Sequence, residues 1–90
     1  MGIKLIGEVQ VKDVRELRTK DKSRIWAHQL EVAYMGGAMS LRFGDGDVEN
    51  IDRARNLMGK PARVEAWPQV DNRGDTIWIV DKIDPSKGVA

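Results

Sequence analysis

The segment from Arg24 to Phe43, RIWAHQLEVAYMGGAMSLRF, constrains the fold of this chain most strongly. Each half alternates apolar and polar residues, which is typical of a β-strand with one buried face. The glycines Gly36 and Gly37 lie between the halves. Two-residue hairpin turns need positive φ angles, which glycine adopts without steric cost. The segment therefore predicts a β-hairpin closed by Gly36-Gly37.

The alternation also predicts which residues lie opposite each other. With Met35 opposite Ala38, the buried face carries the pairs Tyr34 with Met39, Val32 with Leu41, and Leu30 with Phe43. The other face carries Ala33 opposite Ser40 and the oppositely charged pair Glu31 and Arg42. A slip of one residue would expose the whole apolar set, so we expect a well-specified register.

Length and composition indicate one small globular domain. The chain has 90 residues, of which 41% are hydrophobic and 32% charged. No apolar run reaches membrane-spanning length and no signal-peptide pattern is present, so we expect a cytoplasmic protein with no membrane partner. There is no cysteine, which excludes disulfides and thiolate chemistry. The net charge is only +1, so any affinity for nucleic acid must come from a local arrangement of charge.

The segments before the hairpin predict a strand and a basic loop. Residues 3–11 alternate as a half-buried strand, and Gly7 interrupts it at an apolar position. A glycine inside a strand often marks a bulge or bend, which a small barrel needs. Residues 15–24, RELRTKDKSR, form the most basic segment of the chain. Because a charge run is often only a solvated face, this loop is equally consistent with a plain hairpin connection.

The segments after the hairpin predict one helix and two more strands. Asp47 is a good helix N-cap, and Gly59 followed by Pro61 ends the helical pattern. Residues 61–70 and 76–83 alternate as strands, with turn residues at 71–75 between them. The order strand, strand, strand, helix, strand, strand is that of the five-stranded Greek-key OB-fold barrel. We expect a single OB-fold domain over residues 1–85 and a short flexible tail over 86–90.

The final hairpin carries the main candidate site. If Ala66 lies opposite Ile79, then Trp67 faces Trp78 and Arg63 faces Lys82, all on the outer face. Opposed like charges and exposed indoles destabilise a free protein, which indicates a ligand. Bases stack on aromatic rings and cations contact phosphates. OB-folds bind oligonucleotides with strands 2 and 3 and the loops after strands 1 and 4. The candidate nucleic-acid-binding residues are Trp67, Trp78, Arg63, Lys82, Arg73, Arg42, Lys20, Lys22 and Arg24.

In size, element order and tryptophans beside basic residues, the chain resembles the OB-fold single-stranded DNA-binding proteins. The resemblance implies sequence-tolerant binding of single-stranded DNA or RNA, often by an oligomer. One departure concerns the outer face of the central hairpin, where that family often carries stacking aromatics. Here that face carries Ala27, Gln29, Glu31, Ala33, Ala38 and Ser40, with Arg42 as its cation. Trp26 and His28 share the phase of Leu30 and point inward unless a bulge reverses them.

A second interpretation assigns the tryptophans to a protein contact. Trp67 and Trp78 with Val80 could form a subunit interface, since aromatic residues are enriched there. The chain would then be a non-catalytic interaction or self-association module, which the low net charge favours. No catalytic motif is present, and a lone His28 without cysteine is a poor metal site. We therefore expect no enzyme activity, no metal and no cofactor.

Overall fold

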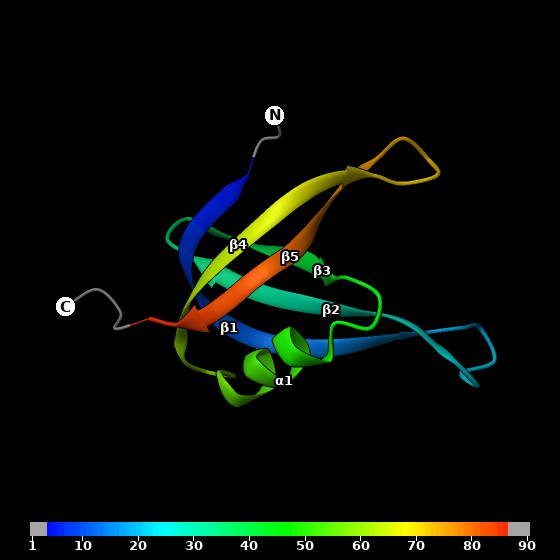
Figure 1. Cartoon of the computed structure of the whole chain (residues 1–90), viewed down its shortest axis with the longest axis horizontal. Coiled ribbons are helices and arrows are strands. Elements are labelled where there is room, and N and C mark those ends of the chain that lie inside the picture. Colours follow the sequence, from blue (N-terminus) through cyan, green and yellow to red (C-terminus); the bar gives the residue numbers. More distant parts are fainter. Residues whose placement is uncertain (1–3, 87–90) are drawn as a thin grey trace.

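A computed structural model describes residues 4–86 as a closed five-stranded β-barrel (Figure 1). The order around the barrel is β1-β2-β3-β5-β4, with β3 and β5 parallel and the other neighbours antiparallel. One helix lies between β3 and β4, as predicted for an OB-fold. The elements are β1 Leu5–Arg18, β2 Ile25–Tyr34, β3 Gly37–Phe43, α1 Val48–Asn56, β4 Pro61–Val70 and β5 Thr76–Pro85.

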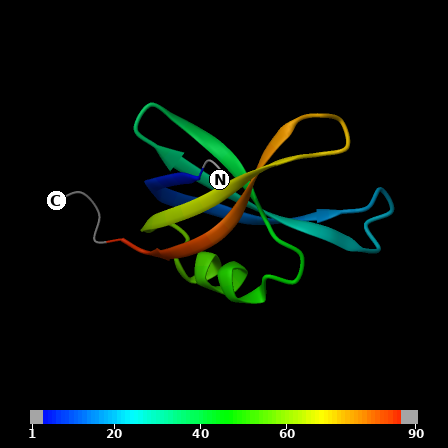
Figure 2. The ribbon, with the colours of Figure 1, turned by 45° about the horizontal axis from the view of Figure 1, so that its top comes forward.

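The core is built from the inward positions of all five strands and is covered on one side by α1 (Figure 2). Ile51 and Ala54 are the buried apolar residues of the helix. The Asn50 side chain fixes the helix to β5, because it donates to the Asp81 carbonyl at 3.1 Å and accepts from the Ile83 amide at 3.3 Å. The predicted N-cap is confirmed, since the Asp47 carboxylate accepts from the Asn50 amide.

The turn of the central hairpin lies one residue earlier than predicted. Tyr34 pairs with Gly37, so Met35 and Gly36 form the turn and only Gly36 has a positive φ, of 95°. Gly37 is a strand residue, and a Cβ there would lie 3.1 Å from the Tyr34 hydroxyl oxygen. The absence of a side chain at Gly37 thus makes room for the Tyr34 ring.

Each residue of β2 therefore faces a partner two positions away from the predicted one. Leu30 lies opposite Leu41 and Val32 opposite Met39. The predicted faces are retained for Leu30, Val32 and Leu41, which are buried, because side chains alternate with a period of two. The prediction that Tyr34 is buried is wrong, since at the end of β2 its side chain is 46% exposed. The predicted Glu31 and Arg42 pair is wrong. Glu31 lies opposite Ser40, and its carboxylate contacts the Arg15 Nε at 2.6 Å.

The irregularity expected at Gly7 lies elsewhere in β1. Pairing with β4 runs without interruption from Leu5 to Gln10. The register shift falls between Val11 and Asp13, where β1 leaves β4 and continues along β2. A bulge at this place lets one long strand pair with two neighbours.

A bulge between β4 and β5 changes the final hairpin. The register shifts beside Glu65, so Trp67 lies opposite Ile79 and not opposite Trp78. Val80 and Ile83 are both buried despite being three residues apart. Trp78 shares the phase of Val80 and packs against the core. The prediction that both indoles share the outer face is therefore wrong.

The predicted like-charge pair across this hairpin is also wrong. Arg63 lies opposite Asp84, and Lys82 lies opposite Glu65. Each cation thus faces a carboxylate, which stabilises a sheet where two like charges would weaken it.

The last strand ends later than the sequence predicts. β5 extends to Pro85, and the Ser86 amide donates to the Pro61 carbonyl at 3.2 Å. The Ser86 hydroxyl also donates to the Glu8 carboxylate at 3.0 Å. Ser86 is therefore held by β1 and β4, while the rest of the predicted tail lies outside the described residues. Over residues 4–86, α1 is too short and polar to cross a membrane.

Substitution of Leu30 by Ala tests the core. Leu30 is completely buried at the centre of the barrel, so we expect the variant to lose about 2–5 kcal/mol of unfolding free energy. Urea denaturation measures this loss. The control is Ile6→Ala, because Ile6 is half exposed on the outer face of β1. Equal losses in the two variants would contradict the assigned faces.

Candidate nucleic-acid interface

Two β-hairpins project from the same end of the barrel (Figures 1 and 2). One joins β1 to β2 and has its tip at residues 19–24; the other joins β4 to β5 and has its tip at residues 71–75. We call this the projecting end. It brings together the two loops that OB-folds use to bind oligonucleotides.

The tip of the first hairpin is held by the Asp21 carboxylate. Asp21 accepts hydrogen bonds from the Thr19 hydroxyl at 2.6 Å, the Ser23 amide at 3.0 Å and the Ser23 hydroxyl at 2.7 Å. These bonds lower the pKa of Asp21 to about 2. The turn is completed by Lys22, which adopts a positive φ of 61°. This ordered turn exposes the side chains of Lys20, Lys22 and Arg24.

The tip of the second hairpin has a similar construction. The Asp71 carboxylate accepts from the amides of Arg73 and Asp75, both at 2.9 Å. Gly74 supplies the positive φ that the turn needs. The Arg73 side chain is exposed at this tip.

Between the two hairpins, Trp26 and Arg42 form a cation–π pair on the outer face. The β1–β2 register shifts next to Arg18, which leaves Trp26 as an extra residue in β2. Its indole N–H donates to the Arg18 carbonyl at 3.2 Å, and the guanidinium carbon of Arg42 lies 5.1 Å from the ring centroid. The Trp26 side chain is 53% exposed, so the prediction that it points inward is wrong. His28, which has the same predicted phase, is less exposed. The bulge thus places the Trp26 ring on the outer face, although the alternation pattern predicts that it points into the barrel.

Trp67 lies on the same outer face, further round the barrel. Arg42 pairs with Ile79, and Ile79 pairs with Trp67, so the three side chains form one row across β3, β5 and β4. The neighbouring pair Phe43 and Val80 is buried, which directs this row outward. The Lys4 ammonium nitrogen lies 4.8 Å from the Trp67 ring centroid at the end of the row.

Trp78 does not join this row. It lines a small hollow of about 140 Å³ beside Arg42, together with Ile77 and Gln29. The three tryptophans therefore have different environments. Trp26 and Trp67 present rings on the outer face, and Trp78 packs against the core.

The cations around Trp67 are paired with carboxylates. Lys4 lies 2.8 Å from Glu65 and 2.9 Å from Asp81. Hydrogen bonds in this cluster raise the pKa of Lys4 and lower the pKa values of Glu65 and Asp81. Two predicted phosphate contacts are also paired, since Arg63 lies 4.0 Å from Glu65 and Lys82 lies 3.5 Å from Asp84.

The unpaired cations are concentrated at the projecting end. Within residues 4–86, the cations with no carboxylate inside 4.0 Å are Lys12, Lys20, Lys22, Arg24, Arg42, Lys60 and Arg73. Four of these lie at the two hairpin tips, and Arg42 lies between the hairpins. The predicted residues thus divide into an unpaired group at this end and a paired group near Trp67.

In the described part of the chain, no group of three or more His, Asp or Glu side chains is arranged to hold a metal ion. No protein-family model matches the chain, and no curated protein sequence matches it either.

The pKa of Asp21 tests the first hairpin tip. Because its folded-state pKa is lowered from 3.8 to about 2, the stabilising bonds are present above the unfolded value and are lost as the pH falls through about 2. An NMR titration of the Asp21 carboxyl carbon should have a midpoint near 2. Combined Thr19→Val and Ser23→Ala substitution should move the midpoint upward. A wild-type midpoint at the ordinary value would contradict this account of the turn.

Proposed function

We propose that this protein binds single-stranded nucleic acid at its projecting end. The observation that carries the proposal is the placement of four unpaired cations at the two hairpin tips and of a fifth, Arg42, over the exposed indole of Trp26. An aromatic platform with cations on both sides suits a chain of bases joined by phosphates. The closed OB-fold barrel supports the proposal, because it sets the two loops beside strands β2 and β3.

In this proposal, Trp26 stacks one base and Arg42 contacts the adjoining phosphate. The indole is fixed by its bond to the Arg18 carbonyl, so little side-chain entropy is lost on binding. Arg42 lies over the indole ring, and the rest of the half-exposed ring is free to contact a base. The tip cations Lys20, Lys22, Arg24 and Arg73 then contact phosphates on either side.

Trp67 is the second platform in this proposal. It lies on the same outward row as Arg42 and is 40% exposed. The carboxylates of Glu65 and Asp81 beside Lys4 repel phosphates, so we assign Trp67 to base stacking alone. Because Arg63 and Lys82 are paired with carboxylates, we assign them a smaller part in phosphate binding. Trp78 packs against the core and lines a small hollow beside Arg42, so we assign it no base contact.

Low net charge is compatible with this function. The charges on the barrel wall cancel in local ion pairs, such as Lys4 with Glu65 and Arg15 with Glu31. The remaining cations act at short range, within the Debye length of about 8 Å at physiological salt. Stacking does not read the 2′-hydroxyl, so the proposal covers DNA and RNA, with single-stranded DNA the ligand that the family resemblance favours.

Replacement of Trp26 by Ala tests the stacking contact. A base–indole stack contributes about 1–3 kcal/mol, so affinity for a labelled oligothymidine should fall by roughly 5- to 150-fold. Fluorescence anisotropy of the label measures this change. The control is Tyr34→Ala, because Tyr34 is an exposed aromatic residue outside the projecting end. Unchanged affinity in the Trp26 variant, or equal wild-type affinity for a matched duplex, would contradict the proposed site.

Salt dependence tests the phosphate contacts separately. If Arg24 contacts a phosphate, Arg24→Gln should reduce the slope of log K against log salt by about 0.7. Binding isotherms at several salt concentrations give this slope. Arg55→Gln is the matched control, because Arg55 lies on α1 and pairs with Asp52 at 3.9 Å. The assignment of Arg24 is wrong if both variants retain the wild-type slope.

A further inference from the structure

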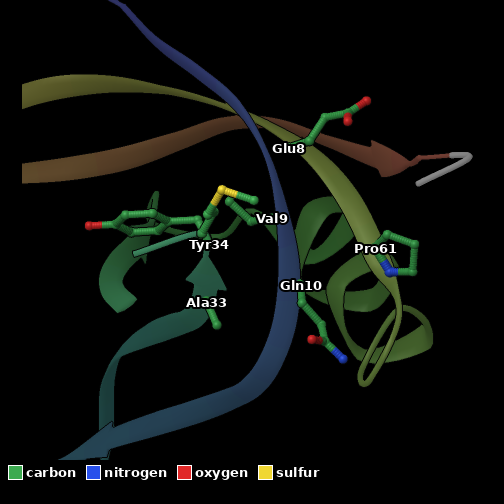
Figure 3. A pocket seen from close by; sticks show the side chains of 7 residues that line it. Glu8, Val9, Gln10, Ala33, Tyr34 and Pro61 are labelled. Carbon is green, nitrogen blue, oxygen red and sulfur yellow. The ribbon is translucent and has the colours of Figure 1, made fainter. Parts of the chain in front are cut away.

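An apolar hollow opens beside the β2–β3 hairpin, whose turn lies at the opposite end of the barrel from the projecting end (Figure 1). The hollow has a volume of about 380 Å³ and adjoins a second hollow of about 470 Å³, which Figure 3 shows. The two share Glu8, Val9 and Tyr34. The apolar wall of the first consists of Leu5, Val9, Val32, Met39, Leu41 and Val64.

The hollow exists partly because Gly7 has no side chain. Gly7 lines it from a strand position between Leu5 and Val9, which pack against the core. A Cβ at Gly7 would meet no other atom within 4 Å, and its φ is not in the positive range that requires glycine. Neither backbone strain nor crowding therefore explains the glycine. Its effect is to leave space between the side chains of Leu5 and Val9, which are only partly buried.

Met35 lies at the rim of the adjoining hollow of about 470 Å³, next to Tyr34, which lines both hollows. Its side chain is 100% exposed at the tip of the β2–β3 turn, and its neighbour Tyr34 is 46% exposed. A single exposed apolar side chain is common in soluble proteins, but Tyr34 and Met35 lie together beside an apolar hollow, and contiguous apolar surface is typical of a contact site. Methionine is flexible and polarizable, so it fits well into irregular apolar cavities. An exposed apolar side chain thus lies next to an apolar hollow on one surface.

Charges of both signs surround this surface without ion-pair partners. Among residues 4–86, no cation lies within 4.0 Å of the Glu8 carboxylate, which accepts a hydrogen bond from the Ser86 hydroxyl, and no carboxylate lies that close to Lys12 or Lys60. Glu8 is on the rim, Lys60 precedes the rim residue Pro61, and Lys12 lies beside Met39. A two-fold contact can therefore place Glu8 of one copy next to Lys60 or Lys12 of the other.

We propose that a second copy of this chain docks on this surface by two-fold symmetry. Met35 of each copy enters the hollow at Gly7 of the other, and Glu8 lies near a lysine of the other copy. In such an isologous contact, each apolar contact and each charge pair occurs twice, once in each direction. The projecting ends of both copies remain free, so the dimer would present two nucleic-acid interfaces.

Sedimentation velocity over a range of protein concentrations tests the proposal. The wild type should change from monomer to dimer as concentration rises. Met35→Ser and Gly7→Leu should each weaken association by about tenfold or more, the first by removing the inserted side chain and the second by filling the hollow. Met58→Ser is the matched control, because Met58 is also exposed but lies just after α1. Thermal unfolding and oligothymidine binding establish that each variant is folded.

A mixture of the two variants gives the sharpest test. The Gly7→Leu copy keeps Met35, and the Met35→Ser copy keeps an open hollow, so together they can form one of the two contacts. We expect a mixed dimer that is stronger than either variant alone and weaker than the wild type. Failure of this mixed dimer, or wild-type association in either variant, would overturn the proposal.

Two further results would distinguish a second copy of the chain from a small ligand as the occupant of the hollow. A wild type that stays monomeric at every concentration would overturn the proposal, and indole binding in its hollow would assign the site to a small apolar ligand. Association and nucleic-acid binding can fail independently. Trp26→Ala should still dimerise, whereas Met35→Ser should still bind oligothymidine as a monomer.

Discussion

Closure of the barrel depends on a short parallel contact between β3 and β5. Arg42 pairs with Ile79 there, and Phe43 pairs with Val80. Burial of Phe43 and Val80 completes the core, and alternation then forces Arg42 and Ile79 outward. The same contact therefore closes the fold and places a cation on the outer face. Beyond it β3 ends, while β5 leads back to the hairpin that projects past the barrel.

The faces of the strands could be predicted from the sequence better than their partners. A buried face repeats every second residue, so Leu30, Val32 and Leu41 are recognisable from alternation alone. Which residues lie opposite each other depends on turns and bulges, and these shift the partners without changing the alternation of apolar and polar residues. A shift of two residues in the central hairpin kept its faces. The bulge between β4 and β5 moved Trp78 to the core side.

The candidate site illustrates the same limit. Loops at 19–24 and 71–75 could be placed together from element order, because the OB topology fixes which loops share an end. The division between paired and unpaired cations could not be predicted from the sequence, because it depends on the register of the strands. The sequence pattern predicts Arg63 and Lys82 as phosphate ligands, but each lies opposite a carboxylate. Alternation alone predicts that Trp26 points inward, because no sequence signal marks the extra residue in β2.

NMR mapping with an oligothymidine tests the central claim most directly. Amide and indole signals of the wild type would be recorded during titration with the single strand. The account predicts that the largest shifts come from Trp26, Arg42 and the two hairpin tips, with smaller ones at Trp67. Signals near Gly7 and Met35 should stay in place at constant protein concentration. Shifts centred on the Gly7 hollow, or none at low salt, would contradict the assignment of the projecting end to nucleic acid.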